Sequence, residues 1–321
     1  MRIFKAAFFV RLALSASAAF AQSYPTKPVK IIAGFPPGGA ADLLARVMAD
    51  KLSAAMGQPF VVENRPGAGG TIGADAVAKA SPDGYTLLLG VTASQTIAPS
   101  IYKSLPYDSA KDFKPVALVA TIPVALVVNP SVPAQTAREF VAVAKAAPAP
   151  MQFASSGSGA IPHLAGELFQ LSQGVKLQHV AYKGAALAMS DLLSGRVQLM
   201  FDNLPTVLAH IRSGKLRALG VAGNNRARAL PDLPTLAEAG VPGVEVGSWF
   251  GVLAPAGTPD AIVALLSREI AKAVHADEAK ARMDAMGAEP AFLGPEDFSK
   301  LIRAETGKWA KLVKATGAQA D

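Results

Sequence analysis

The chain has 321 residues, of which 51% are hydrophobic, and this predicts about two globular domains of ~150 residues each and excludes a disordered chain. Its formal net charge is +7, but its basic residues are scattered without long runs, which argues against a nucleic-acid-binding protein. No cysteine occurs, so disulfides, thiolate metal ligands and cysteine nucleophiles are excluded.

The N-terminal segment has the pattern of a secretory signal peptide. An apolar stretch ends in Ala19-Phe20-Ala21, a small-residue cleavage pattern, and it is preceded or interrupted by the basic residues Arg2, Lys5 and Arg11. We therefore expect residues 1–21 to be removed on export to the periplasm. No later segment offers the ~18 uninterrupted apolar residues of a membrane span, so we expect the exported chain to be soluble.

Strand-like and helix-like patterns alternate along the rest of the chain, which is typical of an α/β protein whose sheets lie between helices. Strands are predicted at 29–33, 60–63, 86–90, 124–128, 151–154, 177–181, 197–201 and 216–221. Helices are predicted at 43–56, 71–80, 137–147, 162–171, 185–193, 205–212, 260–274 and 295–314. The alternation favours parallel strands, and only helical patterns are recognised beyond residue 254.

Two segments predict crossings between domains. The segment around 120–123 joins two apolar strands without a helix, and a return is expected near 249–254. We therefore predict one lobe from residues 22–122 plus 250–321 and a second lobe from residues 123–249, each with a central sheet flanked by helices.

The loop between the first strand and the first helix is a candidate anion site. It comprises Gly34-Phe35-Pro36-Pro37-Gly38-Gly39-Ala40-Ala41-Asp42. Its prolines stiffen the loop, its glycines allow close approach to the backbone, and the start of the next helix presents free N–H groups. The alternative is a tight turn with Asp42 in the first turn of the helix.

A second loop of the same kind comprises Ser155-Ser156-Gly157-Ser158-Gly159-Ala160-Ile161-Pro162-His163. Its hydroxyl and N–H donors suit a carboxylate or bridging waters, whereas the alternative is a polar surface turn. Thr92, Ser94 and Gln95 follow another strand and add donors from the first lobe.

Two further strand ends carry polar residues, at Tyr182-Lys183 and at Asp202. Ligands of open α/β sheets lie at the carboxyl ends of strands, so these residues are expected at the same crevice. Lys183 either contacts a ligand anion or is a solvated charge. Asp42 and Asp202 would repel a carboxylate, so each is expected to hold loop N–H groups or to bind a donor group of the ligand.

Enzyme motifs are weak. The run from Gly67 to Gly73 resembles a dinucleotide loop but has Ile72 where its third glycine belongs, and none of the four histidines has helical metal-binding spacing. A hydrolase triad of Ser156, His163 and Asp202 remains an enzyme alternative. We predict no catalytic residues, no metal site and no cofactor.

Ordered motifs along nearly the whole mature chain resemble a known receptor family. They are Tyr24-Pro25-Thr26-Lys27-Pro28, the Pro-Pro-Gly-Gly loop, Val62 to Gly70, Pro82 to Leu87, Leu105 to Asp108, Ala181 to Gly184 and Pro255 to Pro259. In these the chain resembles the Bug-type extracytoplasmic solute receptors of tripartite tricarboxylate transporters.

The resemblance implies a two-lobe Venus-flytrap fold of the type II class, with mixed central sheets flanked by helices, that closes on a small carboxylate. The ligand would be held by the loops at 35–42 and 155–159 without an obligatory arginine. Many members carry Ser or Thr in the position after Gly39, where this chain has Ala40 followed by Ala41. The implied partners are membrane permease subunits, or a sensor kinase in the alternative of a ligand sensor, and the protein is expected to be a monomer.

Overall fold

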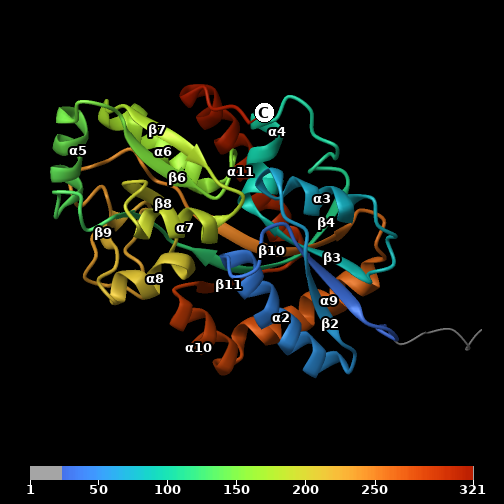
Figure 1. Ribbon diagram of the computed structural model, residues 1–321. Helices are drawn as coiled ribbons and strands as arrows, with labels where there is room; N and C mark the ends of the chain where they lie inside the picture. Colours follow the sequence, from blue (N-terminus) through green and yellow to red (C-terminus); the bar gives the residue numbers. More distant parts are fainter. Residues whose placement is uncertain (1–23, 321) are drawn as a thin grey trace, which may run out of the picture.

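The structure, a computed structural model, describes residues 24–320, and the predicted signal peptide lies outside them. Two mixed β-sheets stand side by side, with the second at the left of Figure 1. The first sheet has the order β11-β4-β10-β3-β1-β2. Its strands are β1 (Val29–Ala33), β2 (Phe60–Asn64), β3 (Thr86–Val91), β4 (Phe113–Ile122), β10 (Ser248–Pro255) and β11 (Glu289–Leu293).

The second sheet has the order β7-β6-β8-β5-β9. Its strands are β5 (Val124–Val128), β6 (Met151–Ser155), β7 (Leu177–Ala181), β8 (Leu199–Asn203) and β9 (Arg217–Val221). The helices are α2 (Ala40–Met56), α3 (Thr71–Ala78), α4 (Ala98–Ile101), α5 (Ala137–Ala146), α6 (Ile161–Gln173), α7 (Ala185–Leu193), α8 (Leu204–Arg212), α9 (Asp260–His275), α10 (Asp277–Met286) and α11 (Pro295–Thr316). Short helical segments η2 (Ala68–Gly70) and η3 (Ala93–Ile97) complete the described elements.

The segments expected to cross between lobes are themselves strands. β4 ends at Ile122 in the first sheet and β5 begins at Val124 in the second, so Pro123 alone separates them. The chain returns between β9 and β10, and β10 pairs antiparallel with both β3 and β4. The lobe boundaries at 122 and 250 remain a prediction.

The mixed sheets confirm the fold class that the resemblance implies, whereas the parallel strands that the alternation favours are found only in part. β1 pairs parallel with β2 and β3, and β6 pairs parallel with β7 and β8, but the strands on either side of Pro123 run antiparallel to their neighbours. A strand entered directly from the other sheet has no crossover helix to reverse its direction, and this gives mixed sheets.

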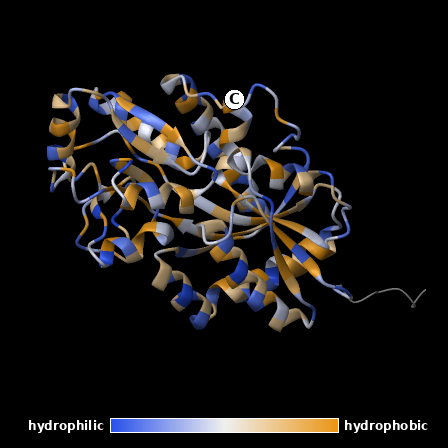
Figure 2. Cartoon of the chain, viewed as in Figure 1, coloured by the Kyte–Doolittle hydropathy of each residue, from blue (hydrophilic) through white to orange (hydrophobic). Residues whose placement is uncertain are grey.

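The expectation that only helices follow residue 254 was also wrong. β11 is a short edge strand that contains Pro290, and a proline makes such a segment unlike a strand in sequence. α10 was not predicted because its sequence is polar, as its blue residues in Figure 2 show.

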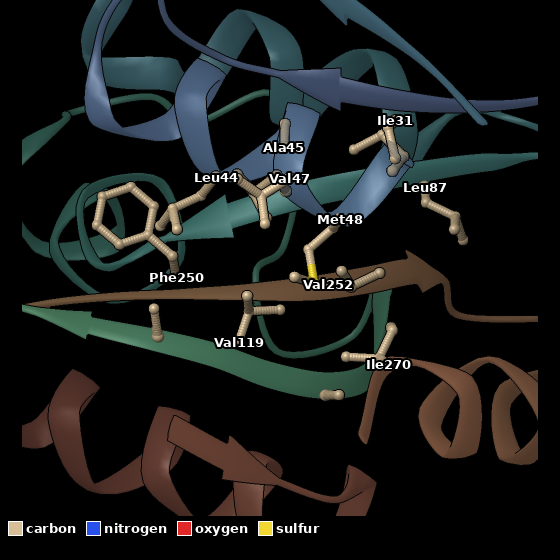
Figure 3. Close-up of a cluster of buried hydrophobic side chains, with 14 of the residues drawn as sticks. Ile31, Leu44, Ala45, Val47, Met48, Leu87, Val119, Phe250, Val252 and Ile270 are labelled. Carbon is tan, nitrogen blue, oxygen red and sulfur yellow. The ribbon is translucent and has the colours of Figure 1, made fainter. Parts of the chain in front are cut away.

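The first core is built around α2. Leu44, Val47 and Met48 recur at helical spacing, are fully buried and lie against Phe250 and Val252 of β10 (Figure 3). Gly57 ends α2 in the left-handed conformation (φ 69°), which glycine adopts without steric cost. This packing fixes the start of α2, and therefore residues 34–42, against the first sheet.

The C-terminal helix α11 joins both cores. Phe298 and Ile302 pack with first-sheet residues, whereas Trp309 and Val313 belong to a buried cluster that contains Phe153 of β6. The expectation that the last helices pack only on the first lobe was therefore wrong for α11.

Candidate ligand-binding site

A cavity partly open to solvent is walled by residues that follow strands of both sheets. Its lining is mostly apolar, with a few polar groups. It is lined by Phe35, Pro36, Pro37, Gly39, Ala40, Ala41, Val91, Thr92, Ala93, Ser156, Ala160, Ile161, Pro162, Ala185, Ala186, Asp202, Asn203, Thr206, Ser248 and Phe250. Such a lining suits a small carbon skeleton with few polar groups.

Four helices begin at this cavity. The first residues of α2, α6, α7 and α8, or their N-cap residues, all line it, and no side chain caps any of these four helix starts. Helix starts carry a partial positive charge and N–H groups without partners in the helix. At α8 the Leu204 N–H donates to the Pro123 carbonyl (2.9 Å) and Pro205 has no N–H, so it is the starts of α2, α6 and α7 that favour an anion. Each follows a strand directly, which explains why all four meet at the carboxyl ends of strands.

The loop 34–42 is held from behind by Asp42. The Asp42 carboxylate accepts hydrogen bonds from the Gly38 N–H (3.0 Å) and from Asn64 Nδ2 (3.0 Å). Arg46 contacts both of its oxygens, with Nε 3.0 Å from Oδ2 and Nη2 2.9 Å from Oδ1. Burial acts to raise the pKa of Asp42, but these hydrogen bonds outweigh it and keep that pKa below its usual value. Asp42 is thus an ionised anchor of the loop and faces away from the cavity.

The loop 155–163 rests on a buried pair of stacked histidines. The His163 and His179 rings are 4.0 Å apart, His163 Nδ1 accepts the Gly159 N–H (3.2 Å), and His179 Nε2 lies 2.6 Å from the Ser155 hydroxyl. Burial lowers the pKa of His163 to about 3 and that of His179 to about 4, so both are neutral at pH 7.

Asp202 is the one carboxylate in the cavity wall within residues 24–320, and it is 1% exposed. Its Oδ1 accepts the Asn203 N–H (2.8 Å), and its Oδ2 lies 2.6 Å from the Thr206 hydroxyl. Burial raises the pKa of Asp202 to about 6, against the opposing effect of these two bonds.

A second cavity adjoins the first, because Phe35, Pro36 and Ser156 line both. Its other walls include the loop at 66–70, Gly157, Ser158 and the segment from Ala181 to Gly184. The two sides of the molecule touch here. The Tyr102 hydroxyl donates to the Ser158 carbonyl (3.3 Å), and a Cβ on Gly184 would lie 2.7 Å from Pro36.

The structure brings most of the predicted site residues to these two cavities. Phe35, Pro37, Gly39, Ala40, Ser156 and Asp202 line the first, and Gly157, Ser158, Tyr182 and Lys183 line the second. Gly38, Asp42, Ser94, Ser155 and His163 line neither.

Of these five, Gly38 is exposed, whereas Asp42, Ser94, Ser155 and His163 lie buried behind the walls because their polar groups are used internally. Ser94 is 1% exposed and its carbonyl accepts the Tyr107 hydroxyl, while Ser155 is fully buried against His179. The imagined triad is not assembled, because Ser155 rather than Ser156 bonds a histidine, and no hydrogen bond joins Ser156, His163 and Asp202 within the described residues.

Sequence reasoning missed several lining residues. Thr206 lies in the first turn of α8, and its position after a strand end could have identified it. Ser248 and Phe250 could not be found in this way, because they begin β10, whose pairing only the fold reveals.

Within residues 24–320, no helix has the length and apolar character needed to cross a bilayer. In the same part of the chain, no group of three or more His, Asp or Glu side chains could hold a metal ion.

Comparison with known proteins gives consistent matches. Residues 44–318 match the family described as "Tripartite tricarboxylate transporter family receptor". The chain is 41% identical to Protein BugT of Bordetella pertussis over 97% of this chain and 96% of that one.

Two solved structures of R. palustris proteins are also similar. Rpa4515, solved with adipate, has a TM-score of 0.90 and 38% identity, covering 93% of this chain and 100% of that one. MatC, solved with bound malate, has a TM-score of 0.85 and 32% identity, covering 90% of this chain and 100% of that one. These likenesses confirm the predicted two-lobe α/β solute-binding fold.

Replacing Asp42 with Ala should release the first loop, because the Gly38 N–H, Asn64 and Arg46 lose their shared acceptor. We expect a loss of about 2 kcal/mol in the free energy of unfolding, measured by urea denaturation. The control is Asp50→Ala, which removes an exposed carboxylate paired with Arg282. Equal stability of the two variants would contradict the anchoring role.

Replacing Gly184 with Ala should prevent the two sides from meeting, because the new Cβ would clash with Pro36 and φ is +122°. We expect ligand affinity, measured by calorimetry, to fall at least about tenfold. Gly214→Ala is the matched control, since Gly214 also has positive φ (+69°) but nothing within 4 Å. Unchanged affinity in the Gly184 variant would show that this contact is not needed for binding.

The histidine stack should make the protein less stable in mild acid. Below about pH 6.5 the unfolded chain binds protons that the folded His163 and His179 exclude, so stability falls as pH drops toward about 4. Asp202 opposes this between about pH 6 and pH 4, because its folded form binds a proton that the unfolded form releases.

The two histidines outweigh the one carboxylate, so we expect a net loss of about 3 kcal/mol between pH 6.5 and pH 4.5 from these groups. Urea denaturation across this range would measure it, with the double variant His163→Gln/His179→Gln losing much less. An equally steep loss in the double variant would rule out the stack as the cause.

Proposed function

This chain belongs to the tripartite tricarboxylate transporter receptor family, as its motifs predicted. We propose that it is a periplasmic receptor that captures a small carboxylate and delivers it to membrane permease subunits. It would bind its ligand between the lobes 22–122 plus 250–321 and 123–249, as a monomer and without chemical change to the ligand. The predicted signal peptide at residues 1–21 supports export.

The observation that carries this proposal is the meeting of three uncapped helix starts, those of α2, α6 and α7, at one largely apolar cavity. A carboxylate placed there would accept backbone N–H groups from α2, α6 and α7, with the Ser156 hydroxyl as a further donor. In a cavity closed from water these hydrogen bonds are stronger than in solution. No arginine lines either cavity within residues 24–320, so backbone donors would carry the recognition.

The ligands of similar proteins support a carboxylate. Adipate and malate, bound by the two R. palustris relatives, are both short dicarboxylates. The adjoining second cavity, with the exposed Lys183 at its wall, offers room and positive charge for a distal carboxylate.

A thermal-shift screen of the mature protein tests this function. The panel holds mono-, di- and tricarboxylates, amino acids and aromatic acids, each beside its uncharged amide or ester. We expect at least one acid to stabilise the protein by about 2.7 kcal/mol at 100 times its dissociation constant, while the uncharged analogue does not.

Mass spectrometry of the denatured protein would detect a ligand retained from the cell. If the protein is ligand-free and no acid of the panel raises its melting temperature, the proposal of a carboxylate receptor is contradicted. Uptake of the identified acid by cells that carry or lack this chain beside its permease subunits would then separate transport from sensing.

A further inference from the structure

The cavity contains acceptors as well as donors. Asp202 stands at the end of β8, opposite Ala125 of β5, and its neighbour Asn203 begins the turn into α8. Both residues line the same cavity as the four helix starts. A carboxylate is an unexpected component of a site built for an anion, because like charges repel.

Asp202 is only partly satisfied by the protein. Its two oxygens can accept about four hydrogen bonds, and the structure supplies two donors, the Asn203 N–H and the Thr206 hydroxyl. The Thr206 hydroxyl also lies 2.7 Å from the Asn203 carbonyl, and its single hydrogen can serve only one of these acceptors at a time.

Asp202 also lacks a counter-ion. Among the ion pairs of residues 24–320, no Lys, Arg or His nitrogen lies within 4 Å of its carboxylate, whereas Asp42, the other buried carboxylate beside the cavity, is paired with Arg46. A buried ionised group without a partner is costly, so buried charges are normally paired.

Asn203 adds a second unsatisfied acceptor in the same wall. Its side-chain Oδ1 is buried and has no hydrogen-bond donor within the described residues. Two adjacent acceptors, one charged, thus stand at a cavity that a ligand would fill, and the missing donor is of a kind that a ligand can bring.

We propose that the ligand carries a hydrogen-bond donor, an ammonium or hydroxyl group, beside its carboxylate, and that Asp202 and Asn203 bind this donor while the helix starts bind the carboxylate. This inference rests on the proposed function and narrows the substrate class to amino or hydroxy carboxylates. A site whose acceptors bind a donor group of the ligand disfavours analogues that lack this group, because the acceptors are then buried without a hydrogen-bond partner.

Calorimetry with matched acids tests the inference. Each set keeps one carbon skeleton and changes one group: succinate, malate and aspartate, then glutarate, 2-hydroxyglutarate and glutamate, then butyrate, 2-hydroxybutyrate and 2-aminobutyrate. We expect a donor-bearing member of at least one set to bind about tenfold or more tightly than its unsubstituted partner. A larger gain for the amino acid than for the hydroxy acid would identify an ammonium, and the reverse a hydroxyl.

Asp202→Asn and Asn203→Ala link the preference to these residues. We expect Asp202→Asn to reduce the preference for the donor-bearing acid about tenfold, and Asn203→Ala to reduce it less. The quantity compared is the ratio of the two affinities within a set, because removing the Asp202 charge also changes the affinity for the unsubstituted acid. Asp50→Asn, an exposed carboxylate outside both cavities, should keep the wild-type preference. If Asp202→Asn does not fold, Asn203→Ala carries the test.

Two results would overturn the inference: unsubstituted acids that bind as tightly as their partners in every set that binds, or variants that weaken all members of a set equally. Both leave the carboxylate receptor intact. Failure of every acid in the broader screen to bind would instead overturn the proposed function itself.

Discussion

The convergence of uncapped helix starts on one cavity is the feature on which the rest of the site depends. A helix start without a side-chain cap forgoes about 1 kcal/mol of stabilisation, and α2, α6 and α7 all do so beside the same space. Each would gain hydrogen bonds from an anionic ligand. Under the proposed function, stability given up in the free protein becomes affinity for the ligand.

Backbone recognition requires that the loops keep their shape, and buried polar groups behind them serve this purpose. Asp42 binds the Gly38 N–H and Asn64 behind the first loop, while the stacked His163 and His179 bind Gly159 and Ser155 behind the second. Neither group lines the cavities. They act as positioning residues that pre-organise donors, which lowers the entropic cost of binding.

Asp202 introduces the opposite charge into the same wall. It repels a carboxylate that binds close by, and it would attract a donor group on the same ligand. With the proposed donor-binding role of Asp202, an anion site would gain a means of discriminating among acids of similar size. Specificity of this kind depends on the penalty for the wrong ligand as much as on the gain for the right one.

Much of this was determined by the sequence alone. Apolar runs and helical spacing predicted most strands and helices, and the Pro-Pro-Gly-Gly and Ser-Gly loops predicted the anion site, because these signals are local. The tertiary structure alone decided the rest. Ser248 and Phe250 reach the cavity only because β10 pairs with β3. Asp42 and Arg46 are one helical turn apart, so that ion pair is a local feature, whereas the burial of Asp202 without a counter-ion is decided by the fold. Strand pairing and burial depend on residues far apart in the chain, and local patterns carry little information about them.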